Sequence, residues 1–548
     1  MMISLYDTTL RDGAQREGLS FSVADKLRIL QLLDDFGVAY VEGGFPAANP
    51  KDAEFFERAG RAGLRRAKLV AFGSTRRAGT RAENDMNLRA LVHAETEAVA
   101  LVGKSSPLHV MRVLETTLDE NVAMIEESVR FLKHRGREVV YDAEHFFDAY
   151  REDPAYAVRT VRAAADAGAA WVVLCDTNGG SLPSWVHFVT LAVGREISAS
   201  IGVHTHDDGG LAVANALASV EAGGRMVQGT VNGYGERCGN ANLVSLVPAL
   251  AMKLGLDCAP AESLARLTML SRTVSEIANV IPDPHAPYVG RCAFAHKGGL
   301  HVAAVDKVPE SYEHVPPAAV GNSRRAVVSE LSGRGNIRMR ARELGIDVAG
   351  REAAVLAQVK ALEHRGFQLE AAEGTVELLL RRAAPGYAPP FELGDVVVVA
   401  MSGDEPASEE APTTLSSRAT HAMHARASVT VMVAGRVVDE SADGNGPVHA
   451  LDRALRRALI PTYPDLEAVR LVDYKVRILD PDTATAATTR VLVEAACEGA
   501  RWTTVGCSQN ILEASCRALV DSVELFLARR QSEANKTHGA PARSAASM

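Results

Sequence analysis

Two histidines one residue apart, His204 and His206, end an apolar run that has the pattern of a buried strand. Side chains on a strand alternate between its faces, so residues i and i+2 share a face and both imidazoles can reach one point at the strand's end. A carboxylate, Asp12, follows the first strand-like run of the chain. Two imidazoles and a carboxylate favour a divalent metal ion with open positions for a substrate. An isolated histidine pair could equally be satisfied in a polar network, so the rest of the chain has to support the site.

The elements that must position these residues are strands and helices in alternation over residues 1 to 255. Strand-like runs cover 3–8, 39–44, 68–73, 98–103, 138–143, 171–176, 200–206 and 226–232. Strands that alternate with helices predict a parallel sheet, and eight such units in roughly 250 residues match a TIM (β/α)8 barrel. An open doubly wound sheet is the alternative, but eight units without a GxGxxG loop argue against it.

A TIM barrel carries its chemistry at the C-terminal ends of its strands, and polar residues gather at those positions here. They are Arg11 and Asp12, Glu42, Glu144 and His145, Asp176 to Asn178, His204 and His206, and the stretch 232–240. Any one of them could simply cap the helix that follows. The opposite strand ends show no similar collection, which favours an active site.

Beyond the barrel the pattern changes, and we expect an α/β protein with helical subdomains and a C-terminal α+β domain. The expected ranges are 1–270 for the barrel, 271–395 for helical subdomains, 396–425 for a flexible linker, 426–530 for the α+β domain and 531–548 for a disordered tail. Within the α+β domain, strands lead to a helix at 447–459 and strands again lead to a helix at 510–527. This repeated order indicates a pseudo-duplicate.

The composition of the chain argues against nucleic acid and membranes as partners. The 548 residues carry a net charge of −9 without a block of Lys and Arg, so nucleic acid is not an expected partner. There is neither a signal peptide at the start nor an apolar run of about 18 residues, so no membrane partner is expected. The seven cysteines form no CxxC pair, and such an odd, scattered set fits a reducing cytoplasm.

Three stretches, 5–15, 204–206 and 233–240, resemble the family of 2-isopropylmalate, homocitrate and citramalate synthases. Residues 42–46, 144–148 and 294–299 are most similar to its citramalate synthase branch. The resemblance implies a TIM-barrel metal enzyme that condenses acetyl-CoA with a 2-oxo acid. Two departures stand out, because the family usually has Asn where this chain has Asp207, and the branch often has Trp where it has Phe45.

The resemblance also implies roles for particular residues. Metal ligands would be Asp12, His204 and His206, with Asn240 as a fourth ligand that spacing alone does not support, and the ion could be Mn, Mg, Zn or Co. Substrate contacts would come from Arg11, Gln15, Glu42 and Thr177. The base for the acetyl methyl group would be Glu144, acting with His301 and Tyr312. In this family the region around His301 reaches the partner subunit's barrel, so a homodimer is expected.

The C-terminal domain resembles the family's feedback domain, which binds a branched-chain amino acid at a dimer interface. Its effector-binding positions would be Gly444, Gly446, Gly506 and Asn510, in loops that precede helix N-termini, where a carboxylate binds well. Plain turn chemistry and helix capping are the alternative for each. Isoleucine is the expected effector, because citramalate leads toward 2-oxobutanoate and so into isoleucine biosynthesis.

The branch implies condensation of acetyl-CoA with pyruvate and water to give (R)-citramalate and CoA. A 2-isopropylmalate synthase, which uses 2-oxoisovalerate, differs by a few methyl groups in one pocket. An aldol lyase of the 3-hydroxy-3-methylglutaryl-CoA lyase type is a further alternative, although such lyases lack the C-terminal domain. An amino-acid sensor without catalysis would not need Arg11, Asp12, His204 and His206 together.

Overall fold

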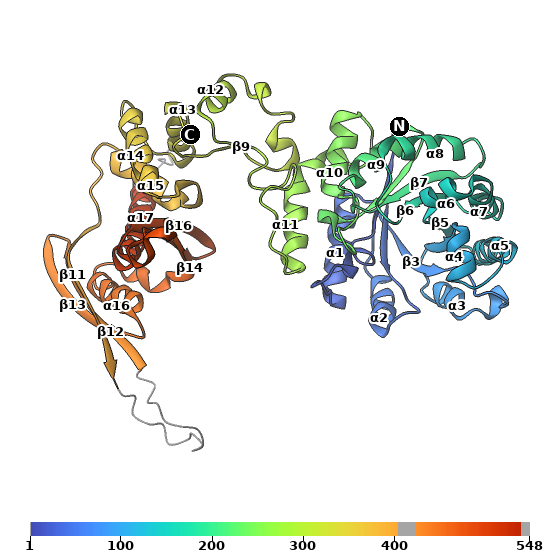
Figure 1. Ribbon diagram of the computed structural model, residues 1–548, viewed down its shortest axis with the longest axis horizontal. Helices are drawn as coiled ribbons and strands as arrows, with labels where there is room; N and C mark the ends of the chain where they lie inside the picture. The colour runs from blue at the N-terminus through green and yellow to red at the C-terminus, as the bar shows by residue number, and fades with distance from the viewer. Residues whose placement is uncertain (1, 404–421, 539–548) are drawn as a thin grey trace, which may run out of the picture. The chain divides into compact units, whose positions relative to one another are not determined.

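The N-terminal part of the chain folds into a closed barrel of eight parallel strands in sequence order, with β1 paired to β8. The computed structural model describes residues 2–403 and 422–538. The strands run from blue to green in Figure 1, with helices around their outside. They are β1 (Ser4–Asp7), β2 (Tyr40–Gly44), β3 (Lys68–Ser74), β4 (Ala98–Lys104), β5 (Glu138–Glu144), β6 (Trp171–Asp176), β7 (Ser200–Thr205) and β8 (Met226–Gly229). The prediction of a TIM barrel is confirmed.

Helices connect the barrel strands, two more helices, α10 and α11, follow the last strand, and sequence signals set the ends of several of them. They are α1 (Val23–Phe36), α2 (Pro50–Ala59), α3 (Met86–His93), α4 (Pro107–Arg112), α5 (Leu118–His134), α6 (Phe146–Glu152), α7 (Pro154–Asp166), α8 (Pro183–Val193), α9 (Ala212–Glu221), α10 (Leu243–Pro248) and α11 (Leu267–Ile277). In α1 the Ser22 hydroxyl accepts the N–H of Asp25 while the Asp25 carboxylate accepts that of Ser22, which satisfies two unpaired donors. The helix ends at Phe36 and is capped by Gly37, whose φ of 97° suits glycine.

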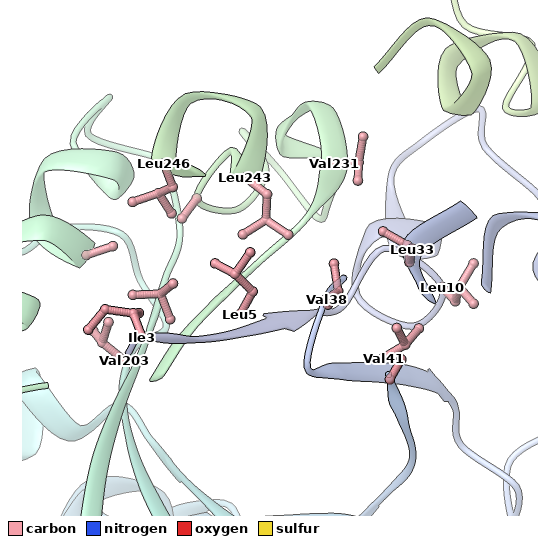
Figure 2. Close-up of a cluster of buried hydrophobic side chains, with 14 of the residues drawn as sticks. Ile3, Leu5, Leu10, Leu33, Val38, Val41, Val203, Val231, Leu243 and Leu246 are labelled. Atoms are coloured by element: carbon pink, nitrogen blue, oxygen red, sulfur yellow. The ribbon is translucent and has the colours of Figure 1, made fainter. Parts of the chain in front are cut away.

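Two apolar layers hold the barrel together because strands covered on both faces bury both sets of side chains. On β1, Leu5 joins the layer between strands and helices, whereas Tyr6 joins the cluster inside the barrel. Figure 2 shows part of the outer layer, with Leu5 near Leu243 and Leu246 of α10. The strand ends are therefore held by packing on both sides, which gives the polar residues beyond them fixed positions.

The remaining chain forms a second compact unit, made of Ala295–Tyr312 and the residues from Arg325 onward. Its helical part contains α12 (Gly299–Lys307), α13 (Arg334–Leu344), α14 (Glu352–His364) and α15 (Glu373–Ala383), with a short parallel pair of β9 (Ala295–His296) and β10 (Arg325–Ala326). Two three-stranded antiparallel sheets follow. The first sheet contains β11 (Phe391–Gly403), β12 (Ala422–Val433) and β13 (Arg436–Gly444) and is followed by α16 (Pro447–Leu459). The second contains β14 (Arg470–Ile478), β15 (Thr489–Cys497) and β16 (Ala500–Ser508) and is followed by α17 (Ile511–His538). The order of elements is thus the same in both halves, as predicted.

Three predicted boundaries differ from the structure. The barrel unit continues through α11 to Phe294, because Leu270 and Val274 of α11 pack into the barrel's outer core, and it also includes Glu313–Arg324. The predicted linker at 396–425 begins and ends as strand, because β11 pairs with β12 as far as Gly403 and Ala422. Residues 404–421, between these two strands, lie outside the described part of the chain.

The expected tail from residue 531 begins as helix, since α17 continues to His538 through a stretch without Gly or Pro. Residues 539–548 lie outside the described part of the chain. Among the described residues, none of the helices combines the length and apolar character needed to span a membrane.

Candidate metal centre and active site

The structure brings Asp12, His204 and His206 together at the C-terminal ends of β1 and β7, with all three side chains buried. One ligand atom from each lies within 4.8 Å of the others. The two histidine Nε2 atoms are 3.2 Å apart, and the Asp12 Oδ2 atom lies 3.5 Å from that of His204 and 4.0 Å from that of His206. Ligand atoms about 2.1 Å from one metal ion are about 3.0–3.5 Å apart, and two of the three separations lie in this range, so the donor set suits a divalent ion.

Asn240, the expected fourth ligand, lies beside this cluster. Its amide nitrogen donates to Asp12 Oδ1 at 3.1 Å, and its bridge to His206 places the two backbones together. Its Oδ1 atom is buried and has no hydrogen-bond partner among the described residues. A buried oxygen without a partner is costly, so a metal ion would satisfy this atom as well.

The electrostatics of the cluster suit metal binding because the donors are in their ligating states. Burial lowers the pKa of His204 to about 4 and moves the pKa of His206 in the same direction, so both imidazoles are neutral at neutral pH. Burial acts to raise the pKa of Asp12, but the Arg11 cation and the hydrogen bond from Asn240 help to hold it below its ordinary value. The site therefore offers two neutral nitrogens and one carboxylate.

Arg11 lies next to the metal cluster and is held from three sides. Its Nε donates to Glu42, its Nη1 donates to Asp12 at 3.2 Å, and its guanidinium carbon lies 3.9 Å from the centre of the Phe72 ring. Glu42 is fully buried and also accepts the Tyr6 hydroxyl at 2.5 Å. Burial opposes the charge on Arg11, but Glu42 and Asp12 raise its pKa, so the residue is a fixed cation.

Two further predicted residues lie at neighbouring strand ends. The Thr177 hydroxyl, after β6, accepts the backbone N–H of His145 at 2.9 Å, which leaves its own hydrogen free to donate. Glu144, the last residue of β5, forms an ion pair with Lys104, the last residue of β4. Its side chain is 24% exposed, so it can be reached from solvent.

Three predicted residues are not brought to the cluster by described contacts. Gln15 is exposed in the loop after β1. His301 and Tyr312 belong to the second compact unit, where their ring centres lie 4.4 Å apart. Their contact agrees with a joint role but leaves that role a prediction.

Packing or capping explains most of the predicted effector positions. A Cβ atom on Gly506 would lie 1.9 Å from the Ala514 carbonyl oxygen, and one on Gly444 would lie 2.4 Å from the Ala450 nitrogen. The Asn510 side chain accepts the N–H of Leu512 at 2.9 Å, as a helix cap does. Gly446 differs, because nothing lies within 4 Å of a Cβ built there.

The two carboxylates after His206, of which Asp207 departs from the family pattern, have partners other than the metal cluster. Asp207 accepts the backbone N–H of Ala212 at the start of α9, at 2.9 Å. Asp208 forms an ion pair with Arg237 at 2.7 Å. Neither carboxylate belongs to the group of possible metal ligands found among the described residues.

Sequence reasoning missed several partners of the site. Gln228 on β8, Lys104 on β4 and Phe72 on β3 contact predicted residues, and Asp142 on β5 contacts Gln228. Lys104 ends a strand-like run and could have been found by the same strand-end argument. Gln228 and Asp142 could have been noticed as polar residues inside otherwise apolar runs, which are informative when buried.

Comparisons with known proteins agree with this architecture. Residues 2–274 match the HMGL-like family, 288–366 match the homocitrate synthase post-HMGL domain-like family, and 398–527 match the LeuA allosteric (dimerisation) domain. An (R)-citramalate synthase of Synechocystis sp. is 49% identical over 95% of this chain and 96% of its own. One of Geobacter sulfurreducens is 46% identical over 96% of this chain and 98% of its own. A probable 2-isopropylmalate synthase of Methanopyrus kandleri is 32% identical over 96% of this chain and 99% of its own.

Proposed function

The chain belongs to the family of (R)-citramalate synthases, and we propose on that premise that it condenses acetyl-CoA with pyruvate and water to give (R)-citramalate and CoA. The observation that carries the proposal is the buried Asp12, His204 and His206 cluster beside Arg11, in a chain that matches those relatives over nearly its whole length. The enzyme is an acyltransferase whose acyl group becomes an alkyl group on transfer.

Asp12, His204 and His206, with the free oxygen of Asn240, would hold the metal. A divalent ion held there would supply Lewis acidity to the carbonyl group of a bound 2-oxo acid. These residues lie at the ends of β1 and β7 and in the loop after β8, so the packed barrel presets their positions. Asp12 also accepts from Arg11 and Asn240, which orients its carboxylate.

Arg11 would donate to the pyruvate carbonyl oxygen, which becomes an alkoxide as the new carbon–carbon bond forms. Its cation is already fixed by Glu42 and Phe72, so little reorganisation is needed when this charge develops. The Thr177 hydroxyl, whose oxygen is already an acceptor, would donate to the substrate carboxylate. These two contacts orient the reacting carbonyl carbon.

Glu144 would remove a proton from the acetyl methyl group, and the carbon left with the electron pair would attack C2 of pyruvate. The ammonium group of Lys104, at the end of β4, stays beside the Glu144 carboxyl group while Glu144 takes up that proton. His301 and Tyr312 would act with Glu144 from the partner subunit. The proton taken up by Glu144 balances the one that the alkoxide needs to become the product hydroxyl. Water then cleaves the thioester, which releases CoA and one proton.

The LeuA allosteric (dimerisation) domain supports regulation of a homodimer. We expect isoleucine to be the effector, because it is the end product that citramalate synthesis serves. The loops at 443–447 and 504–510 are the expected contacts, and Gly446 is the position there with open space around it.

The test is CoA release, followed with a thiol reagent, from the full chain with acetyl-CoA and a divalent metal. Pyruvate and 2-oxoisovalerate are compared side by side. Preference for pyruvate, with isoleucine as inhibitor, is the expected result. Preference for 2-oxoisovalerate would contradict the proposal and assign the chain to 2-isopropylmalate synthesis.

A further inference from the structure

We infer that Gln228 is the positioning residue that sets the metal-binding tautomer of His204, and that Asp142 fixes the orientation of the Gln228 amide. This inference rests on the metal centre of the proposed function. It concerns two buried polar residues inside the barrel that are not metal ligands themselves.

Strand register places Gln228 beside His204. The two residues are partners on the neighbouring parallel strands β7 and β8, so their side chains point to the same side of the sheet. His204 Nδ1 lies 2.8 Å from Gln228 Oε1. The exposed fractions of the two residues are 6% and 1%, so bulk water does not compete for this contact.

The contact determines where the imidazole proton resides. A neutral imidazole has one N–H donor and one unprotonated nitrogen, and an amide oxygen can only accept. Nδ1 must therefore carry the proton, which leaves a lone pair on Nε2. That Nε2 atom is the one 3.2 Å from the His206 Nε2 and 3.5 Å from the Asp12 carboxylate. The tautomer chosen by Gln228 is the one that can bind a metal.

An amide has an oxygen and a nitrogen of similar shape, so Gln228 needs a second contact to keep its oxygen toward His204. Its Nε2 donates to Asp142 Oδ1 at 3.0 Å across the barrel interior. An ionised Asp142 permits only this orientation. In the reversed one, the Gln228 amide oxygen would lie against a carboxylate oxygen of Asp142, and both atoms can only accept. A protonated Asp142 still offers its carbonyl oxygen to the same N–H. Burial and the nearby Glu42 carboxylate raise the pKa of Asp142 to about 8 against the effect of Arg11, so the neutral acid, whose carbonyl oxygen accepts this N–H, is its main form at neutral pH.

The same chain of contacts is absent at the second histidine. His206 Nδ1 is buried and has no partner among the described residues, so nothing comparable selects its tautomer. Metal affinity should therefore depend on Gln228 through His204 alone. Outer partners of metal-binding histidines typically change affinity by about 10- to 100-fold when removed.

The experiment titrates Co²⁺ into the full chain and follows its visible absorption, which reports both affinity and coordination. Gln228→Met removes the acceptor at similar volume and is expected to weaken Co²⁺ binding about 10- to 100-fold. Gln228→Glu keeps an acceptor for Nδ1–H and should bind within a few-fold of wild type. Asp142→Ala should show an intermediate loss, because the amide can then reverse.

Asn215→Leu is the matched control, since Asn215 is a buried amide of α9 that donates to Ser181 and Asp176. It should leave Co²⁺ affinity unchanged, and circular dichroism confirms that each variant is folded. A folded Gln228→Met variant with wild-type affinity and spectrum would overturn the inference, as would an equal loss in Asn215→Leu. If the wild-type chain binds no Co²⁺, the metal centre and the inference fail together, whereas normal binding by Gln228→Met removes the inference alone.

Discussion

The guanidinium carbon of Arg11 lies over the face of the Phe72 ring, 3.9 Å from the ring centre. The ring comes from β3 and the cation from the loop after β1, so two strands of the barrel fix one charge. A cation held over an aromatic face keeps its remaining N–H groups free for other acceptors. In this site the acceptors are Glu42, Asp12 and, by our proposal, the substrate carbonyl.

Replacing Arg11 by alanine should lower kcat about 100- to 1,000-fold, because one fixed donor to a developing oxyanion is lost. The fold should survive, since the side chain lies at a strand end and is 15% exposed. Steady-state CoA release and the melting temperature give the two readouts. Normal turnover by a folded Arg11→Ala variant would remove Arg11 from the mechanism.

Phe72→Leu should lower kcat/KM about 2- to 30-fold, which corresponds to about 0.5–2 kcal/mol for a cation–π contact. Phe131→Leu is the matched control, because Phe131 carries Arg135 over its ring at 5.1 Å on the outer helix α5. That variant should keep full activity. Equal losses in both variants would indicate a general packing effect.

Metal binding should raise the melting temperature of the barrel. A ligand at 100 times its dissociation constant adds about 2.7 kcal/mol to the stability of the folded state. Treatment with a chelator should therefore abolish CoA release and lower the melting temperature, and added Mn²⁺, Co²⁺ or Zn²⁺ should restore both. His206→Ala should lose the metal-dependent shift, while His134→Ala, an exposed residue at the end of α5, should keep it.

Asp34 should make the barrel's stability depend on pH. Its buried carboxylate accepts the backbone N–H groups of Arg65, Arg66 and Ala67, and these bonds hold its pKa below the ordinary value although burial opposes them. A pKa lower in the folded than in the unfolded state gives stability that is present above about pH 4 and lost as the pH falls further.

Asp34→Asn should reduce the free energy of unfolding by about 1–3 kcal/mol at pH 7, with a smaller difference at pH 4. Thermal unfolding followed by tryptophan fluorescence measures it. Asp35→Asn is the control, because Asp35 is its exposed neighbour in an ion pair with Arg65 and should change stability little. A pH-independent difference would contradict the argument.

Gly446→Ala tests the effector site without disturbing the fold. Its φ of −169° is extended backbone that any residue adopts, and a Cβ would meet nothing within 4 Å. The variant should remain folded and active but should need several-fold more isoleucine for half inhibition. Gly506→Ala should instead unfold the C-terminal domain, since its Cβ would overlap the Ala514 carbonyl. Unchanged inhibition of Gly446→Ala would move the effector site elsewhere.

Much of the barrel could be predicted because its strands are buried on both faces and read as separate apolar runs. The ligand cluster could be predicted because alternation puts His204 and His206 on one face and parallel strands end together. The partners Gln228 and Asp142 could not, since their contact crosses the barrel and depends on register between strands far apart in sequence. The strand β11 was missed because its exposed positions, such as Val397 and Val399, hold valine instead of polar residues. The alternation that marks a strand with one exposed face is therefore lacking, and so is a clear boundary before the polar segment.

The candidate ligands also mark where the ring of strands closes. Asp12 follows β1, whereas His204, His206 and Asn240 come from β7 and the chain after β8, and the pairing of β1 with β8 is the last that the growing chain can form. During synthesis Asp12 cannot meet its full set of partners until residue 240 has left the ribosome. A bound ion would link the first strand of the barrel to the last two. A chain that stops before β8 would therefore have neither a closed barrel nor a complete metal site.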